Sequence, residues 1–351
     1  MKLRSGIIGC GNISKFHFDA LNKLGQDITW VCDIDEAAGR KRAAEYNASF
    51  SRDYRALLKS DEVDVVHVTL ISKLHKEICL AALDQGKHVI CEKTLSENAA
   101  DSMEIVRKAE NKGAHLYTAY MKRYLPGVVK SAELLGSLGN VLSARFFTYQ
   151  NWGNLLEPVP EGSFFYTPEN GQSAVKQNYG GGILYCGGSH ILDLIGRHFG
   201  RPRAVSGFIR KPPHLDYEIF AGAMLNYSDF PVMFEAAAHP LAEIGFLKDG
   251  WMEGFSITGT NGRIEFHSSK WDEVEIKAPK LIYYDNNTGR EEVFDFEPVS
   301  PFYLAIKSFY EDIGRDRQTV QSRSTGYEVD MLIEEIMLSA RKGEAREIAW
   351  G

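Results

Sequence analysis

The sequence predicts two domains of different class, an α/β domain on a parallel sheet and an α+β domain on a large, mainly antiparallel open sheet. In the first 120 residues, short apolar stretches alternate with stretches of helical spacing. This alternation is typical of βαβ units whose helices cover both faces of a parallel sheet. After Pro126 the apolar stretches follow one another with few helices between them, which favours antiparallel pairing.

Length and composition agree with two globular domains. The chain has 351 residues, and at roughly 150 residues per domain it is long enough for two. We place the domains at residues 1–122 and 123–351. With 44% hydrophobic and 25% charged residues the composition is ordinary,. The formal net charge of −7 argues against a nucleic-acid partner, because nucleic-acid binders carry a basic surface stripe.

Nothing in the sequence indicates a membrane or secreted protein. No apolar run reaches the length of about 18 residues that a spanning helix needs, and the N-terminal apolar stretch is too short for a signal peptide. The cysteines are scattered and none forms a Cys-x-x-Cys pair, which argues against a disulfide framework or a zinc ribbon. We therefore expect a reduced, soluble, cytoplasmic protein.

The expected strands of the first domain are short and β-branched or apolar. They are Leu3–Ile8, Ile28–Cys32, Val63–Leu70, His88–Cys91 and His115–Tyr120. The stretches Lys73–Gln85 and Asn98–Lys112 carry apolar residues at helical spacing,. Gly86 and Gly113 follow these helices closely, where a left-handed residue ends a helix.

The second domain begins with an expected helix over about 127–138 and is then rich in alternating, strand-like sequence. The expected strands are Ala204–Ile209, Phe220–Tyr227, Val232–Ala238, Phe255–Gly259, Arg263–Phe266 and Val274–Lys277. Two helices, Phe302–Ile313 and Tyr327–Arg341, end the chain. The stretch Asn151–Gly182 is rich in Gly, Asn and Pro without periodicity, which predicts a long loop, and such loops are typically functional or disordered.

A glycine pattern at the end of the first strand predicts a dinucleotide site of the Rossmann type. Gly9 permits the tight turn and Gly11 lets the backbone approach a pyrophosphate, while Asn12 and Ile13 lead into a helix N-terminus. The third position of the pattern is Ser14 instead of Gly or Ala. The helix therefore has to accommodate a hydroxyl group where it packs on the strand.

The end of the second strand predicts which dinucleotide binds. Asp33 follows that strand, 22 residues after Gly11, where a carboxylate accepts hydrogen bonds from ribose hydroxyl groups. The carboxylate would repel a 2′-phosphate, so NAD is favoured over NADP. Arg40 and Arg42 on the following helix keep the NADP alternative open.

With these motifs the sequence resembles the Gfo/Idh/MocA family of oxidoreductases, the relatives of glucose-fructose oxidoreductase and inositol dehydrogenase, over almost its full length. The resemblance rests on Gly9-Cys10-Gly11 with Asp33, Thr69 with His75, Glu92-Lys93-Thr94, Arg123-Tyr124-Leu125-Pro126, Gly180-Gly181-Gly182 with His190 and Asp193, and Ile257-Thr258-Gly259-Thr260-Asn261-Gly262. It implies a nucleotide-binding N-terminal domain and a C-terminal domain whose open sheet forms oligomer contacts. It also implies that nicotinamide meets a sugar or cyclitol between the domains.

The resemblance implies that Lys93 is catalytic. Glu92-Lys93-Thr94 follows a strand at the carboxyl edge, where ligands of open α/β sheets bind. The family usually has Glu-Lys-Pro, and its Lys stabilises negative charge on the reacting oxygen. Thr94 in place of Pro departs from that pattern.

The resemblance also implies that His190 is the general base, since an imidazole titrates near neutral pH. Asp193 lies three residues later, on the same face of the expected helix, where it either orients a neighbour or serves as an ordinary helix carboxylate. Many family members carry Asp where this chain has Cys186, and a thiol is a poor hydrogen-bonding partner. The usual Lys-Asp-His set is therefore reduced to Lys93 and His190.

Further site residues are expected on weaker grounds. Glu92, Lys93, Thr69 and His75 complete the predicted cofactor set, although His75 is equally well explained as a structural residue. The predicted substrate set is Lys93, Arg123, Tyr124, Trp152, Lys176, Tyr179, Cys186 and His190, with Gln177 and His239 as additional candidates. Aromatic faces and hydrogen-bond donors are what a polyol site needs. The histidines form no His-Glu-x-x-His motif, so no metal site is predicted.

We therefore expect an NAD(H)-dependent oxidoreductase that acts on a secondary alcohol or ketone of a sugar, sugar derivative or cyclitol. The family resemblance leaves two alternatives open. One is an NAD-dependent glycosidase or lyase that works through transient oxidation at C3, and the other is a non-catalytic dinucleotide sensor. We expect a homodimer or homotetramer that assembles through the C-terminal sheet.

Overall fold

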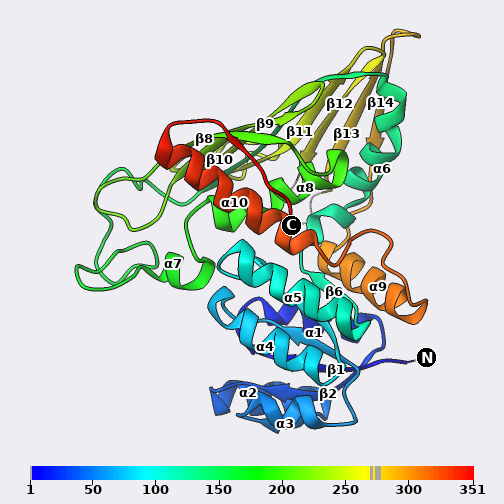
Figure 1. Ribbon diagram of the computed structural model, residues 1–351, viewed down its shortest axis with the longest axis vertical. Coiled ribbons are helices and arrows are strands. Elements are labelled where there is room, and N and C mark those ends of the chain that lie inside the picture. Colours follow the sequence, from blue (N-terminus) through cyan, green and yellow to red (C-terminus); the bar gives the residue numbers. More distant parts are fainter. Residues whose placement is uncertain (1, 269–271, 273–277) are drawn as a thin grey trace. The chain divides into compact units, whose positions relative to one another are not determined.

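The computed structural model describes residues 2–268, 272 and 278–351 (Figure 1). Its contacts divide the chain into a first unit, Met1–Met121 with Phe302–Asp330, and a second unit, Lys122–Pro301 with Met331–Gly351. The two domains expected at 1–122 and 123–351 stay a prediction. By contacts, the segment after Pro301 belongs to the first unit up to Asp330.

The first unit is built on a parallel sheet. Its strands are β1 (Arg4–Ile8), β2 (Asp27–Cys32), β3 (Ser49–Ser51), β4 (Val65–Val68), β5 (His88–Cys91) and β6 (Leu116–Thr118). In the part of the chain that is described, they form a six-stranded sheet in the order β3-β2-β1-β4-β5-β6, with every neighbouring pair parallel. The strand order reverses beside β1, and ligands of open α/β sheets bind at such a switch point.

Helices connect these strands, and their ends follow from local sequence. They are α1 (Ser14–Lys23), α2 (Glu36–Tyr46), α3 (Tyr54–Lys59), α4 (Ser72–Asp84) and α5 (Ala99–Lys112). Asp35, Asp53 and Asn98 cap α2, α3 and α5 through their side-chain oxygens, because the first N–H groups of a helix lack partners within it. The two helices predicted most clearly, α4 and α5, are confirmed to within one residue at each end.

Aromatic packing explains why α9 (Pro301–Gly314) belongs to the first unit from Phe302 onward. The ring of Phe302 stacks on Phe16 of α1, with centroids 4.7 Å apart. The ring of Phe309 stacks on Tyr117 of β6, with centroids 4.1 Å apart. Both contacts bury large apolar surfaces and add a favourable ring–ring geometry.

The second unit is built on a larger sheet. Its strands are β7 (Val141–Asn151), β8 (Ala204–Arg210), β9 (Phe220–Tyr227), β10 (Phe230–His239), β11 (Trp251–Gly259), β12 (Gly262–Ser268), β13 (Lys280–Asp285), β14 (Arg290–Asp295) and β15 (Arg346–Glu347). Over the described residues they form a nine-stranded sheet in the order β14-β13-β12-β11-β7-β10-β9-β8-β15. The β10–β7 pair is parallel and the other described pairs are antiparallel, which confirms a mainly antiparallel sheet.

Several elements of this unit differ from the expectation. The expected strand Val274–Lys277 lies outside the described residues. Strands β7, β13 and β14 were not expected. The expected helix over 127–138 is an α-helix, α6 (Pro126–Leu134), that continues as a 3₁₀ turn, η2 (Leu135–Leu138). The loop expected at Asn151–Gly182 contains one short helix, α7 (Ala174–Tyr179).

The remaining helices of the described chain lie around the glycine-rich motif and at the C-terminal end. Leu184–Gly188 form a π-helical turn, η3, that leads directly into α8 (Ser189–Phe199). The helix α10 (Thr325–Lys342) begins in the first unit and ends in the second.

The two faces of the second sheet differ in burial. The rings of Phe234, Phe146, Phe255 and Phe266 face one another across neighbouring strands and are buried. Side chains alternate along a strand, so the residues between these rings lie on the opposite face. That face exposes Met224 and Met233 by about half of their surface. In the described part of the chain, no helix is long and apolar enough to cross a membrane.

Candidate active site

The predicted phosphate loop has the geometry that its glycines require. Gly9 has a φ of +103°, and a Cβ at this position would lie 2.6 Å from the carbonyl oxygen of Thr69, so no larger residue fits there. A Cβ on Gly11 would have no described atom within 4 Å. The space over Gly11 is therefore open to a ligand, as a dinucleotide pyrophosphate needs.

The departure at the third position of the glycine pattern is accommodated locally. The hydroxyl group of Ser14 donates a 2.7 Å hydrogen bond to the carbonyl oxygen of Gly11. The side chain of Ser14 is buried, so this bond satisfies a hydroxyl group that burial alone would penalise. Asn12 is exposed and Ile13 is the last residue before α1. The loop thus opens a helix N-terminus, which attracts phosphate through its N–H groups and dipole.

Asp33 joins the end of β2 to the phosphate loop. Its Oδ2 accepts from the backbone N–H of Cys10 at 2.6 Å, and its Oδ1 accepts from the N–H of Asp35 at 2.7 Å. Burial and the nearby Asp33 raise the pKa of the Cys10 thiol to about 12, so this thiol is not a reactive group. Arg40 and Arg42 pair with carboxylates of their own helix, Glu36 and Glu45.

Thr69 and His75 contact backbone carbonyl groups. The hydroxyl group of Thr69 lies 2.7 Å from the carbonyl oxygen of Gly9 and 3.1 Å from that of Ile8. The imidazole of His75 is fully buried between the carbonyl oxygens of Thr94, at 2.8 Å, and Leu70, at 3.1 Å. Burial lowers the pKa of His75, so this ring is neutral and donates to one of the two. Both residues hold loops at the carboxyl edge of the sheet.

The segment that carries Lys93 is fixed on both sides. Before it, Oε2 of Glu92 accepts from the backbone N–H of Lys93 at 3.2 Å, and Oε1 lies 2.9 Å from Nε2 of His17. After it, the hydroxyl group of Thr94 donates to the carbonyl oxygen of Ser96 at 3.0 Å. The Lys93–Thr94 peptide bond is cis. Glu92 and Thr94 are buried, whereas Lys93 is partly exposed.

In the second unit, a buried carboxylate holds the glycine-rich motif. Oε2 and Oε1 of Glu218 accept from the backbone N–H groups of Gly182 and Leu184 at 3.0 and 2.9 Å. A Cβ on Gly182 would lie 1.9 Å from the carbonyl oxygen of Glu218, so a glycine is required. Burial raises the pKa of Glu218 despite these hydrogen bonds. The π-helical turn η3 starts at this contact, and such turns are frequent at functional sites.

Three residues of the predicted substrate set come together in the second unit. The Tyr179 hydroxyl group hydrogen-bonds to the thiol of Cys186, and this contact and burial together raise the pKa of Tyr179. Tyr179 and Trp152 pack on one apolar cluster of Leu155, Val175, Leu215, Tyr217 and Ile219. Nε1 of Trp152 donates to Oε1 of Gln150 at 3.1 Å. Lys176 lies one turn before Tyr179 on α7 and is partly exposed.

Arg123 of the predicted substrate set lies in a buried ion pair. Its guanidinium group binds both carboxylate oxygens of Asp193, at 3.0 and 2.5 Å. This bidentate geometry is the strong form of the Arg–carboxylate contact. It ties Arg123 to α8 one turn after His190, which is itself mostly buried. Tyr124 is also buried. His239 ends β10, with Nδ1 accepting from the N–H of Leu241 at 3.0 Å.

Sequence reasoning missed the residues that position these segments, above all Glu218, His17 and His67. Each is a polar residue inside an apolar stretch, as in Tyr217-Glu218-Ile219 and Phe16-His17-Phe18. A buried polar group requires a partner, so such isolated residues are the signal that could have pointed to them. Gln177, by contrast, is an exposed residue that bonds to the carbonyl oxygen of Gln172.

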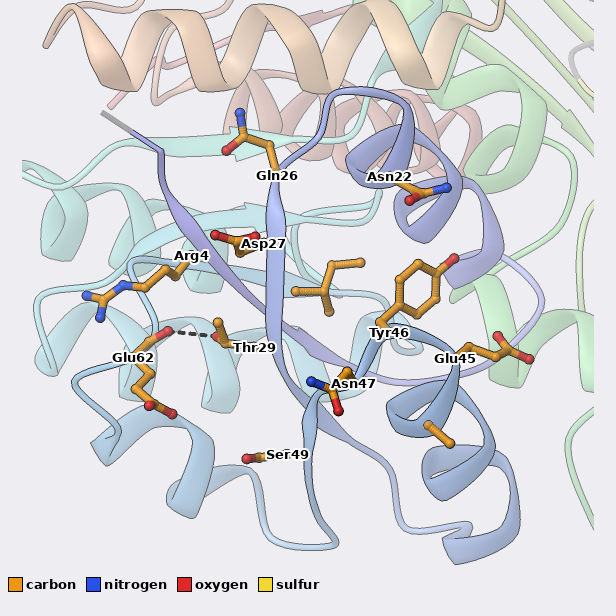
Figure 2. Close-up of a pocket in the computed structure, with 12 residues that line it drawn as sticks. Arg4, Asn22, Gln26, Asp27, Thr29, Glu45, Tyr46, Asn47, Ser49 and Glu62 are labelled. Atoms are coloured by element: carbon orange, nitrogen blue, oxygen red, sulfur yellow. Dashed lines mark hydrogen bonds between the residues drawn. The ribbon is translucent and has the colours of Figure 1, made fainter.

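A separate depression lies at the opposite, amino edge of the first sheet (Figure 2). It is open, encloses about 790 Å³ and is lined by polar residues that include Arg4, Thr29 and Glu62. The hydroxyl group of Thr29 donates to the carbonyl oxygen of Glu62 at 2.7 Å, and Arg4 pairs with Asp64. No predicted site residue lines this depression. Among the described residues, no group of three or more His, Cys, Asp or Glu side chains could hold a metal ion.

Comparison with known proteins identifies relatives among sugar and cyclitol dehydrogenases. Among curated proteins, inositol 2-dehydrogenase of Salmonella paratyphi B is 33% identical over 144 residues, which are 39% of this chain and 42% of that protein. The chain thus matches this relative over less than half of its length. D-xylose 1-dehydrogenase (NADP(+)) 2 of Haloferax volcanii is 23% identical over 98% of this chain and 99% of that protein.

Solved structures show the same fold over the whole chain. Levoglucosan dehydrogenase in complex with NADH and levoglucosan matches with a TM-score of 0.83 and 19% identity over 100% of both chains. An oxidoreductase domain protein from Kribbella flavida matches with a TM-score of 0.84 and 22% identity, again over 100% of both chains. Residues 3–120 match the family model GFO_IDH_MocA, described as an oxidoreductase family with an NAD-binding Rossmann fold. Over these residues the chain is similar to the NAD-binding Rossmann domains of the Gfo/Idh/MocA oxidoreductase family.

Proposed function

We propose that the protein is an NAD(H)-dependent oxidoreductase that moves a hydride between nicotinamide and a secondary alcohol or ketone of a sugar, sugar derivative or cyclitol. One observation carries the proposal. The predicted catalytic lysine, Lys93, stands partly exposed at the carboxyl edge of the Rossmann sheet, on a segment that Glu92 and Thr94 hold by buried hydrogen bonds. Fixing one cation beside a dinucleotide site is the arrangement that electrostatic stabilisation of a reacting oxygen requires.

The cofactor is held mainly by backbone groups of the phosphate loop. Gly9 and Gly11 leave room for the pyrophosphate, and the backbone N–H groups of Asn12 and Ile13, just before α1, would donate to it. The Asp33 oxygens keep lone pairs for the adenine ribose hydroxyl groups, which favours NAD. The pairing of Arg40 and Arg42 with Glu36 and Glu45 supports the same choice, because it occupies the cations that a 2′-phosphate would need.

The predicted cofactor site is supported by hydrogen bonds from three further residues, Thr69, His75 and Glu92. The hydroxyl group of Thr69 donates to the carbonyl oxygen of Gly9 and so fixes the phosphate loop. His75 and Glu92 hold the segment around Lys93 through hydrogen bonds. We therefore propose that these three residues position the cofactor edge more than they bind the cofactor directly.

Lys93 and His190 divide the chemistry at the substrate oxygen. Bound nicotinamide supplies a hydride acceptor or donor. The Lys93 ammonium group hydrogen-bonds the substrate oxygen and stabilises the negative charge that develops on it. His190 takes the hydroxyl proton during oxidation and returns it during reduction.

The substrate class follows from side chains of the second unit. Trp152 and Tyr179 offer aromatic faces for the C–H edges of a ring, and Lys176 and Cys186 stand beside them. A polyol site combines such faces with a small number of placed polar groups. Arg123 contributes by fixing α8, since its guanidinium group pairs with Asp193. The relatives named for inositol, xylose and levoglucosan point to the same class.

Lys93→Ala tests the proposal directly. The change should lower kcat by about 100-fold or more, the usual effect of losing one fixed electrostatic donor, while the Kd for NADH stays within a few-fold. Lys73→Ala, which removes an exposed lysine of α4, is the matched control and should leave both values unchanged. Unchanged turnover in Lys93→Ala would contradict the assignment.

The glycosidase or lyase alternative remains a second candidate. Its basis is Cys186, a thiol that pairs with Tyr179 where many relatives carry Asp. A screen of hexoses, anhydrosugars, inositols and glycosides, followed by nicotinamide absorbance and by product analysis, separates the candidates. A dehydrogenase accumulates NADH. A glycosidase releases free sugar without net NADH, and a sensor binds NADH tightly without turning over any compound.

We further propose that the exposed sheet face joins copies of the chain into a homodimer or homotetramer. Phe208, Met224 and Met233 are each exposed by about half or more, and apolar patches of this kind mark interfaces. Sedimentation velocity should show an oligomer, and Met233→Asp should shift it toward the monomer. A monomeric wild-type protein would contradict the assignment.

A further inference from the structure

A continuous series of hydrogen bonds crosses the interior of the first unit and ends at Glu92. The hydroxyl groups of Ser5 and Tyr310 lie 2.7 Å apart, and the Tyr310 hydroxyl lies 2.9 Å from Nε2 of His67. The Nδ1 atoms of His67 and His17 are 2.9 Å apart, and Nε2 of His17 lies 2.9 Å from Oε1 of Glu92. These residues come from β1, α9, β4, α1 and the end of β5, in that order along the series.

The series is buried throughout. His17, His67 and Ser5 have no exposed surface, and Glu92 and Tyr310 are 5% and 6% exposed. Burial lowers the pKa of His67 well below its usual range, so this imidazole is neutral and carries a single N–H. A neutral imidazole between two polar partners must donate to one and accept from the other.

The carboxylate at one end sets the direction of every bond in the series. A carboxylate only accepts, so Nε2 of His17 donates to Glu92. In a neutral His17 this bond uses the single N–H of the ring, and Nδ1 then accepts from Nδ1–H of His67,. Nε2 of His67 then accepts from the Tyr310 hydroxyl group, whose oxygen accepts from Ser5. Every polar atom of the series is satisfied in this arrangement, and in the low-dielectric interior such aligned bonds strengthen one another.

We propose that Ser5, Tyr310, His67 and His17 form a one-way hydrogen-bond chain that holds Glu92 as an oriented carboxylate, making His17 and His67 positioning residues for Lys93. The link to Lys93 is the second oxygen of Glu92, which accepts from the Lys93 backbone N–H at 3.2 Å. The assignment of a role in turnover rests on the proposed function. The chain itself does not depend on it.

Simple packing does not account for the series. Polar groups are costly to bury, and replacing such a network by well-packed apolar residues is often neutral or stabilising. We therefore infer that these buried polar residues serve a purpose other than stability. The series ends beside the segment of Lys93, where His75 and Cys91 also interact with Glu92. This placement favours orientation of the carboxylate as that purpose.

Histidine tautomers test the chain without any substrate. We would record long-range ¹⁵N–¹H spectra of the full-length protein with NADH at pH 7, and assign the signals of His17 and His67 from His17→Gln and His67→Gln. The expected result is one neutral tautomer each, with the proton on Nε2 of His17 and on Nδ1 of His67. An imidazolium at His17, or the opposite tautomer at either residue, would overturn the proposal.

Glu92→Gln gives the second arm, because an amide can donate as well as accept. The fixed direction should be lost, and both rings should then populate both tautomers. Tyr227→Phe removes a buried hydroxyl group that donates to the carbonyl oxygen of Gly200 in the second unit, so it should leave the two histidine signals unchanged. Retention of single tautomers in Glu92→Gln would show that the carboxylate does not direct the chain.

Turnover then tests the positioning role. His17→Leu should lower kcat by about 100-fold, the effect of a misplaced reacting group, whereas His17→Gln keeps a donor and an acceptor and should recover most of it. Equal turnover in both variants and the wild type would overturn the positioning role. If the tautomers are as expected but no compound is turned over by the wild type, the proposed function fails and the oriented carboxylate stands.

Discussion

The two segments that carry the predicted catalytic residues are held in place by different means. In the first unit, imidazole side chains reach the segment of Lys93 from both sides, His17 through Glu92 and His75 through Thr94. In the second unit, the ionisable side chain of Glu218 binds backbone N–H groups at the start of η3, at a contact too close for any side chain on Gly182. The first segment is thus held by hydrogen bonds from side chains. The second is held by one buried carboxyl group and by a close backbone contact that only glycine permits.

Of the changes that test this difference between the two segments, Gly182→Ala should lower the stability of the protein most. The new Cβ would lie 1.9 Å from the carbonyl oxygen of Glu218, and this atom belongs to the backbone and cannot swing away. We expect the free energy of unfolding to fall by about 3 kcal/mol. The matched control is Gly196→Ala in α8, where a Cβ meets no described atom within 4 Å, and it should stabilise the protein by up to about 1 kcal/mol. Urea unfolding measures both, and an equal effect of the two changes would contradict the contact.

The two segments should also differ in how their contributions to stability depend on pH. The pKa of His75 is lowered from 6.5 by burial, so its contribution to stability is complete above pH 6.5 and is lost as the pH falls toward the folded-state value. The pKa of Glu218 is raised from 4.5 by burial, so its contribution is complete below pH 4.5 and is lost as the pH rises through the folded-state value.

The variants His75→Gln and Glu218→Gln should therefore respond to pH in opposite ways. Each should destabilise the protein by about 1–3 kcal/mol at most, the cost of unsatisfied buried groups. The difference from wild type should be largest above pH 6.5 for His75→Gln and near pH 4.5 for Glu218→Gln. Urea unfolding at a series of pH values measures this. Parallel pH curves for the two variants would show that the two segments are held in the same way.

The smallest effect concerns the phosphate loop. Thr69→Val keeps the shape of the side chain and removes the hydrogen bond to the carbonyl oxygen of Gly9, at a cost of about 1 kcal/mol. Since this bond shapes the loop, the Kd for NADH should rise by about 5-fold. Thr29→Val removes a comparable bond at the opposite edge of the sheet (Figure 2) and should leave the Kd unchanged. Equal Kd values for both variants would remove Thr69 from the cofactor site.

The sequence predicted the first unit better than the second because its signals are local. Strands β1, β2, β4, β5 and β6 follow from short apolar runs, and the structure confirms them. The phosphate loop follows from glycines at fixed spacing and stays a prediction as a cofactor site. In the second unit β7, β13 and β14 were missed, because their side chains face either the core or solvent and mix polar with apolar residues. Pairing in that sheet joins distant segments, and no local pattern specifies it.

The sequence indicated candidate residues for the site, but it did not indicate the buried residues that hold them in place. Lys93 and Asp33 follow from motifs on strand ends. The expected contact of Arg123 with substrate stays a prediction. The structure adds an ion pair between Arg123 and Asp193, and sequence spacing does not reveal a pairing between residues that are seventy positions apart. Glu218 and His67 bind backbone atoms or other buried side chains, so their importance depends on tertiary contacts alone.

The membership of α9 in the first unit has a consequence for how the chain is made. A ribosome that has completed β6 has produced all strands of the cofactor sheet, but not Phe302, Phe309 or Tyr310. Until those residues emerge, the apolar rings of Phe16 and Tyr117 lack their stacking partners and His67 lacks its tyrosine. The segment Lys122–Pro301 of the second unit is therefore synthesised before α9 is available to the first, and the nascent cofactor domain reaches its final packing only near the end of translation.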